Sequence, residues 1–134
     1  MERRREVTIL LDTCTVLWAT LSPAALSGAA REAIADESNE ILVSAASAWE
    51  IATKVRLGKL PGAERLEQNY PTVMEDAGYA QLAIDTESGL RAGRLAAEHR
   101  DPFDRMIAAQ ALALDVPVAS PDAVFDGLGV RRVW

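Results

Sequence analysis

Short apolar runs alternate with longer segments of helical spacing along the whole chain. The apolar runs cover residues 7–11, 41–44, 81–85, 116–119 and 130–134, each about as long as a buried strand. Strands that alternate with helices are typical of βαβ units, in which helices cover a parallel sheet. We therefore expect one α/β domain over residues 1–134, with a central, mostly parallel sheet flanked by helices and a flexible basic N-terminus at residues 1–6.

Helix start and stop signals divide the segments between these strands. Ser22 precedes Pro23, and Ser47 precedes a stretch of helical periodicity, so we predict that each serine is an N-cap. Gly58 is placed to end the helix that Ser47 begins. The predicted helices cover Leu17–Thr20, Pro23–Asp36, Ala48–Leu57, Ala63–Ala77, Glu87–Glu98, Phe103–Leu114 and Ala123–Phe125.

Composition narrows the classes of function. The 134 residues are 49% hydrophobic, which suits one compact core. A net charge of −6 has the wrong sign for a generic nucleic-acid binder, although residues such as Lys54, Arg56 and Arg105 could form local basic patches. The first apolar run is too short for a secretory signal or a membrane helix, so we expect a cytoplasmic protein with no membrane partner.

The single cysteine and the single histidine limit the available chemistry. Cys14 cannot form an intramolecular disulfide, and we expect it to be a small buried thiol. With His99 as the one imidazole, there is little scope for a zinc site.

Four acidic residues, Asp12, Glu50, Asp104 and Asp122, stand where the predicted fold would direct them toward one pocket. Asp12 ends the first strand, Asp122 follows the fourth, and Asp104 lies in the first turn of its helix. Ligands bind beyond the carboxyl ends of the strands in such folds. Two like charges about 4 Å apart repel by roughly 4 kcal/mol at an effective dielectric near 20. Because Mg²⁺ and Mn²⁺ prefer oxygen ligands and would relieve this repulsion, the pattern favours a metal-dependent hydrolase.

Three motifs carry a resemblance to a known family. They are Leu10-Leu-Asp-Thr-Cys-Thr-Val-Leu-Trp18, the run from Ser47 to Leu60, and His99-Arg-Asp-Pro-Phe-Asp-Arg-Met-Ile-Ala-Ala-Gln110. With the tail from Val118 to Trp134, they resemble the PIN-domain family, and most of all its VapC-type toxins of bacterial toxin–antitoxin pairs. The resemblance implies a single PIN-like domain and a ribonuclease that uses Mg²⁺ or Mn²⁺ to cut RNA.

The resemblance also implies roles for individual residues. Asp12, Glu50 and Asp104 match the three core acids of the family, and Asp122 matches a more variable fourth. We expect Asp12 and Asp104 to be the principal metal ligands, with Glu50 orienting or deprotonating the attacking water and Asp122 completing the site. Glu50 and Asp122 could also reach the ion, directly or through water. Accessory roles fall to Thr13 and Ser120, which match small hydroxyl positions, and to Asp101, which could instead be an N-cap before Pro102.

The implied partners are the RNA substrate, a cognate antitoxin and a second copy of the chain. The antitoxin would block the acidic pocket, since a guanidinium pairs well with clustered carboxylates. The expected assemblies are a homodimer and a toxin–antitoxin hetero-oligomer. We predict that Leu57–Met74 is a partner clamp whose apolar positions could line a groove; these are Leu57, Leu60, Leu66, Tyr70 and Val73.

Simpler interpretations exist for single residues. Glu50–Lys54 and Asp101–Arg105 have the i,i+4 spacing of ordinary surface ion pairs, and Asp122 could merely cap a turn. Trp18, Trp49 and Trp134 are expected in the core or at a partner contact rather than as platforms for bases.

Other functions are also open. A phosphatase of the haloacid-dehalogenase type needs a second Asp two residues after Asp12, where this chain has Cys14, and a receiver domain needs paired acids that the chain lacks. The remaining alternative is a catalytically inactive PIN-like binding module that acts through its partner.

Overall fold

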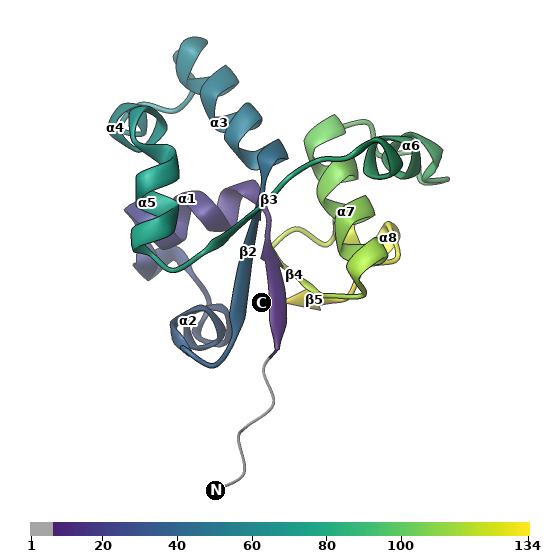
Figure 1. Cartoon of the computed structure of the whole chain (residues 1–134), viewed down its shortest axis with the longest axis horizontal. Coiled ribbons are helices and arrows are strands. Elements are labelled where there is room, and N and C mark those ends of the chain that lie inside the picture. Colours follow the sequence, from purple (N-terminus) through teal and green to yellow (C-terminus); the bar gives the residue numbers. More distant parts are fainter. Residues whose placement is uncertain (1–6) are drawn as a thin grey trace, which may run out of the picture.

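Five parallel strands form one central sheet. The computed structural model describes residues 7–134, so the basic segment at residues 1–6 lies outside the described residues. The strands stand in the order β3-β2-β1-β4-β5 (Figure 1), and each neighbouring pair is parallel. Their bounds are β1 Thr8–Leu11, β2 Glu40–Ser44, β3 Ala80–Leu82, β4 Val118–Ala119 and β5 Arg132–Val133. All five predicted strands are present, although four of them are shorter than predicted.

Helices cover both faces of the sheet, as the alternation of apolar runs predicts. Ile9 and Leu11 of β1 pack into one core cluster with Ile51 and Met74, whereas Leu10 packs into a second cluster on the other face. Successive strand residues point to opposite faces, so a continuous apolar run is buried on both sides. Figure 1 shows α1, α2 and α5 on one side of the sheet and α7 and α8 on the other. The α/β fold with a parallel sheet is confirmed.

The first helix begins directly after β1. It is α1 (Thr13–Leu21), and its N-cap is Asp12, whose carboxylate accepts a hydrogen bond from the Thr15 backbone N–H. The predicted start at Leu17 is therefore wrong by one turn. Asp is preferred at N-cap positions, and this preference at Asp12 explains why α1 starts earlier than predicted.

Both predicted serine caps are wrong. Residues 23–25 form a 3₁₀ turn, η1 (Pro23–Ala25), and α2 (Gly28–Ala35) begins later with Ser27 as its cap, while Ser22 makes no side-chain cap. Helix α3 (Ala45–Arg56) is capped by Ser44 instead of Ser47. Because β2 runs into α3 without a loop, Ser44 is both the last residue of β2 and the N-cap of α3.

The predicted helix over Ala63–Ala77 is broken into α4 (Glu64–Gln68) and α5 (Tyr70–Asp76). Pro71 lies in the first turn of α5 and has no backbone N–H to continue a helix from α4.

The partner clamp predicted over Leu57–Met74 does not form one groove. Leu66 and Tyr70 are buried in the core, and Leu57 is exposed.

The remaining helices are α6 (Thr86–Arg94), α7 (Pro102–Leu114) and α8 (Val124–Gly127). Asp85 caps α6, so it is not the last residue of the third strand as predicted, and the helix ends four residues before the predicted Glu98. Asp101 caps α7 through hydrogen bonds from the N–H groups of Phe103 and Asp104.

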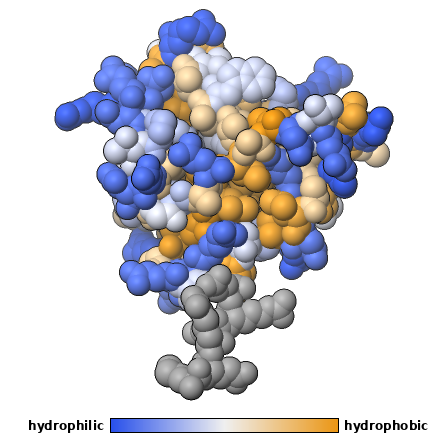
Figure 2. All heavy atoms as spheres, in the orientation of Figure 1, coloured by the Kyte–Doolittle hydropathy of each residue, from blue (hydrophilic) through white to orange (hydrophobic). Residues whose placement is uncertain are grey.

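The tryptophans occupy two different settings. Trp18 packs against Trp134 with ring centroids 5.7 Å apart. Trp49 is 61% exposed, and its ring packs edge-to-face with that of Phe103, with the ring centroids 4.7 Å apart. Figure 2 shows apolar residues gathered at the centre of one face, with charged residues around them. Among residues 7–134, no helix is long and apolar enough to span a membrane.

Candidate active site

The switch in strand order lies between β1 and β4. From β1 the chain winds outward to β2 and β3, then returns to place β4 on the other side of β1. Crevices at the carboxyl ends of strands that flank such a switch are the usual ligand sites of open α/β sheets. Asp12 follows β1 and Ser120 follows β4, and the Asp12 N–H donates to the Ala119 carbonyl at 3.2 Å.

Asp12 accepts hydrogen bonds from the first turn of α1 and from the residue that follows β4. Its Oδ1 accepts from the Thr15 N–H at 2.8 Å, and its Oδ2 accepts from the Ser120 hydroxyl at 2.6 Å. The side chain is buried, and this desolvation raises the pKa of Asp12 even though both hydrogen bonds oppose the shift. A buried carboxylate of this kind is stabilised by a neighbouring positive charge.

Glu50 reaches the same region from α3. It is only 6% exposed, so it is not the surface acid that its sequence position alone suggests. The predicted i,i+4 partner is confirmed, because Lys54 Nζ donates to Glu50 Oε2 at 2.5 Å. This hydrogen bond raises the pKa of Lys54.

Asp104 comes from the first turn of α7. Burial raises the pKa of Asp104 to about 6, although a hydrogen bond between its Oδ2 and His99 Nε2 (2.9 Å) acts in the opposite direction. The negative charge of Asp101 adds to the upward shift. Asp101 is the predicted N-cap of α7, and it faces the same cleft as Asp104.

The candidate acids from four separate segments line one cleft of about 430 Å³: Asp12, Glu50, Asp101, Asp104 and Asp122. Lys54 is the one basic side chain on its wall within residues 7–134. The cleft is therefore strongly acidic. Asp122 also accepts a hydrogen bond from the Val124 N–H at 3.0 Å, so its predicted capping of the turn before α8 is present as well.

Comparison with known proteins identifies the fold and the family. A family model for the PIN domain matches residues 9–130. The chain belongs to the PIN-domain family. The match covers every candidate acid of the cleft, from Asp12 to Asp122.

One curated relative and two solved structures of similar fold illustrate the comparison. Ribonuclease VapC16 of Mycobacterium tuberculosis is 47% identical over 55 residues, which span 41% of this chain and 39% of that protein. The VapBC2 structure from Rickettsia felis, bound to a DNA fragment from its promoter, superposes with a TM-score of 0.68 at 15% identity, covering 94% of this chain and 97% of that chain. A toxin–antitoxin complex from Klebsiella pneumoniae gives a TM-score of 0.58 at 14% identity, covering 86% and 87%.

The oxygen donors of this PIN domain suit a hard divalent cation. Five carboxylates face a single ammonium group across the cleft, and burial raises the pKa of two of them. Within residues 7–134, however, no three side chains of His, Cys, Asp or Glu stand close enough to share one ion. Mg²⁺ is commonly held by one or two carboxylates and completes its shell with water. Oxygen donors of this kind are compatible with an ion held by one or two carboxylates and water, without a three-acid cage.

Of the three accessory residues, Thr13 and Asp101 line the cleft and Ser120 does not. Thr13 lines the cleft, and its hydroxyl lies 3.0 Å from that of Ser47. Ser120 is fully buried behind Asp12 and accepts from the Asp122 N–H at 2.9 Å. Cys14 is half-buried at the wall, and burial together with the charge of Asp12 raises the pKa of its thiol to about 11. The thiol is therefore protonated near neutral pH.

Sequence reasoning missed His99 and Arg105 as parts of the site's framework. His99 is hydrogen-bonded to Asp104. The predicted Asp101–Arg105 ion pair is wrong, because Arg105 donates to backbone carbonyls of residues 92–99 instead. The one sequence signal for His99 was its position five residues before Asp104. At that separation, a side chain just before α7 can contact one in the first turn of the helix.

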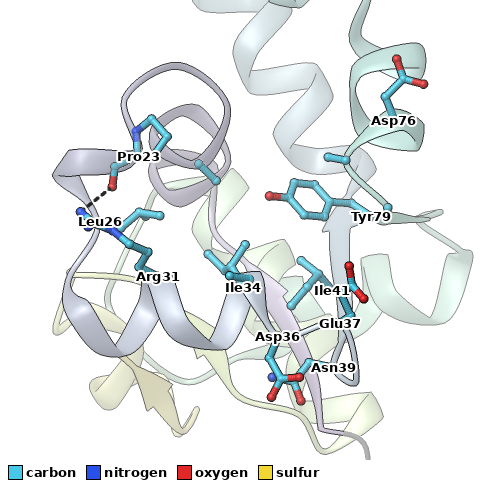
Figure 3. A pocket seen from close by; sticks show the side chains of 14 residues that line it. Pro23, Leu26, Arg31, Ile34, Asp36, Glu37, Asn39, Ile41, Asp76 and Tyr79 are labelled. Atoms are coloured by element: carbon cyan, nitrogen blue, oxygen red, sulfur yellow. Dashed lines mark hydrogen bonds between the residues drawn. The ribbon is translucent and has the colours of Figure 1, made fainter.

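A cavity larger than the acidic cleft, of about 530 Å³, lies elsewhere. Figure 3 shows it between α2 and the turn after α5, with Pro23, Ile34 and Tyr79 around it. It includes Asn39 and Ile41 at the amino end of β2 and shares no residue with the acidic cleft. The candidate acids therefore do not gather in this larger cavity.

Proposed function

We propose that this protein is a Mg²⁺- or Mn²⁺-dependent endoribonuclease and the toxin of a toxin–antitoxin pair. The observation that carries the proposal is the shared cleft. Asp12, which follows β1, lines it together with Glu50 of α3 and Asp104 of α7 in a PIN fold. The similarity over 55 residues to a protein named a ribonuclease supports the same conclusion.

The cleft residues have distinct proposed roles. A divalent ion, when bound, supplies activation of water and neutralises charge on the scissile phosphate. Asp12 and Asp104 hold it, and Asp122 completes the site directly or through water. Glu50 orients the attacking water and accepts its proton. Lys54, beside Glu50 on the cleft wall, is placed to attract a phosphate oxygen of the RNA.

The proposed partners follow from the charge of the cleft. An antitoxin segment carrying an arginine would pair with the carboxylates and exclude RNA. A homodimer and a hetero-oligomer with the antitoxin are the proposed assemblies. The solved toxin–antitoxin complex from Klebsiella pneumoniae has a similar fold, which supports the idea of such a partner.

One observation favours a second candidate, a PIN-like module that binds its partner without cutting RNA. The described residues form no three-acid group ready to hold an ion. An RNA-cleavage assay of the wild-type protein, with and without the ion, separates the two candidates. Only the nuclease requires the ion.

The test is cleavage of RNA by the purified protein. Wild-type protein is incubated with tRNA, rRNA and mRNA in Mn²⁺ or in EDTA, and the cut ends are mapped. We expect cleavage in Mn²⁺, none in EDTA, and a loss of at least 100-fold for Asp104→Asn. The exposed Asp76→Asn, which removes the same charge outside the cleft, is the matched control and should cut normally. Wild-type protein that is inert on every RNA favours the binding module.

A further inference from the structure

The guanidinium of Arg105 makes an unusually complete set of contacts with backbone carbonyls. Nε donates to the carbonyl of Ala92 at 3.1 Å, and Nη2 donates to Gly93 at 3.4 Å and Leu95 at 2.6 Å. Nη1 donates to the carbonyls of Ala97 and His99, each at 2.9 Å. A guanidinium has five N–H donors, so every one of them is used on this segment.

The contacts of Arg105 with Ala92 and Gly93 satisfy backbone carbonyls at the C-terminal end of α6. The last carbonyls of a helix have no partner within the helix. Those of Ala92 and Gly93 lie in the final turn of α6 and are satisfied by Arg105 from the neighbouring helix α7, which lies beside α6 (Figure 1). A positive charge at a helix C-terminus also interacts favourably with the helix dipole.

The remaining contacts fix the segment beyond α6. The three carbonyls that Arg105 binds there belong to alternate residues, as in an extended chain whose carbonyls alternate in direction. The same alternation appears in burial, because residues 95, 97 and 99 are partly buried and residues 96, 98 and 100 are exposed. Arg105 therefore holds the backbone of the segment 95–99 against α7, and Leu95 and Ala97 also pack against the core cluster on that face.

The last residue of this segment contacts an acid of the cleft. The His99 carbonyl accepts from Arg105, and its ring nitrogen Nε2 meets Asp104 Oδ2 at 2.9 Å. Arg105 and Asp104 are adjacent on α7. Because Arg105 binds the His99 carbonyl and the His99 ring contacts Asp104, helix α7, the segment 95–99 and the imidazole form a closed loop of contacts around Asp104. A partner on one carboxylate oxygen fixes the orientation of the other.

We propose that Arg105 is a positioning residue for the acidic cleft, because it holds the 95–99 segment on α7 and thereby sets His99 against Asp104. This inference rests on the proposed function, since it gives Asp104 the role of a metal ligand. Arg105 itself does not line the cleft. Partners that orient metal ligands typically change metal affinity or activity by about 10- to 100-fold when removed.

The test compares wild type with Arg105→Lys, His99→Ala and the double variant. Lysine keeps the positive charge, but its ammonium is a single point with three donors and cannot span the same carbonyls. The exposed Arg94→Lys, at the end of α6, is the matched control. The measurements are Mn²⁺ affinity by calorimetry, hydrogen exchange of the metal-free protein, and cleavage of RNA.

We expect Arg105→Lys to speed exchange of the amides of residues 95–100 by about tenfold or more, with β1 unchanged. It should also weaken Mn²⁺ binding by about 10- to 100-fold. His99→Ala should weaken Mn²⁺ binding to a similar extent, and the double variant should be no worse than His99→Ala, because Arg105 acts through His99. Arg94→Lys should match wild type in all three measurements.

Two results would overturn the positioning role alone: Mn²⁺ affinity within twofold of wild type in Arg105→Lys, or losses that multiply in the double variant. If Arg105→Lys does not fold, His99→Ala still decides, because unchanged Mn²⁺ affinity in that variant also overturns the role. Wild-type protein that neither binds Mn²⁺ nor cuts RNA overturns the proposed function and this role together, and it is recognised before any substitution is made.

Discussion

The Ser120 hydroxyl donates to Asp12 Oδ2 at 2.6 Å and so joins two residues 108 positions apart in the chain. The bond connects the end of β4 to the end of β1, across the switch in strand order. Because the same hydroxyl accepts from the Asp122 N–H, Ser120 links two of the candidate acids without reaching the cleft itself.

Replacing Ser120 by alanine should therefore destabilise the fold from behind the site. Ser120→Ala leaves one oxygen of a buried carboxylate without its donor, and we expect a loss of about 1–3 kcal/mol in the free energy of unfolding. Urea denaturation at pH 7 in EDTA measures it. Ser22→Ala is the matched control, since Ser22 is exposed and makes no side-chain cap, and it should change stability by less than about 0.5 kcal/mol. Equal losses in the two variants would contradict the role given to Ser120.

Asp104 should make the metal-free protein less stable as the pH rises. Its pKa lies near 6 in the fold, against an ordinary value of 3.8. Between these values the unfolded chain releases the proton first, so stability that is fully present below pH 3.8 is lost as the pH passes 6. Allowing for partial exposure, the loss is on the order of 2 kcal/mol.

Removing the titrating group should remove this loss. The stability of Asp104→Asn relative to wild type should rise between pH 4 and pH 7 in EDTA, by urea denaturation at each pH. Asp76→Asn controls for removing one negative charge from the protein. A difference between Asp104→Asn and wild type that stays constant over this pH range would mean that Asp104 is not buried as the structure places it.

The sequence predicted the parts of the fold that depend on local pattern. Continuous apolar runs such as Ile41–Ser44 are buried on both faces, and Asp12 and Asp104 reach one cleft because strand ends and helix starts share an edge of the sheet. Pro71 was a visible signal for the break between α4 and α5, since a proline cannot donate the hydrogen bond that would continue the helix.

Long-range contacts decided what the sequence could not predict. Either Ser44 or Ser47 could cap α3 by local rules, but Ser47 meets Thr13, 34 residues away, and Ser44 also binds Gln110. Arg105 has the spacing of a surface partner for Asp101, and only the folded path of residues 92–99 shows its true acceptors. Which partner a side chain takes depends on the tertiary fold, and one sequence contains no direct record of it.

The Glu50–Lys54 pair should respond unequally to loss of its two members. Glu50 is 8% exposed in its side chain and Lys54 is 41% exposed. Lys54→Met leaves a buried carboxylate without its partner, and we expect a loss of about 1–3 kcal/mol in the free energy of unfolding. Glu50→Gln leaves an ammonium group that water can solvate, and its loss should stay below about 1 kcal/mol.

Urea denaturation at pH 7 without metal measures both variants of the pair. Lys59→Met, at an exposed position beyond the end of α3, controls for the loss of a positive charge and should be near wild type. A larger loss for Glu50→Gln than for Lys54→Met would show that Glu50 is more solvated than its place in the cleft indicates.

Tyr70 offers the opposite kind of test, a substitution expected to cause no loss. Its hydroxyl is buried and, among residues 7–134, has no hydrogen-bond partner, and burial raises its pKa to about 12. A buried hydroxyl without a partner is unfavourable, so Tyr70→Phe, which keeps the ring in the core, should raise the free energy of unfolding by up to about 1 kcal/mol. The urea midpoint measures this change. Tyr79→Phe, at the less buried tyrosine near the start of β3, is the comparison and should gain less. A loss above about 1 kcal/mol in Tyr70→Phe would reveal that the hydroxyl has a hydrogen-bond partner in solution.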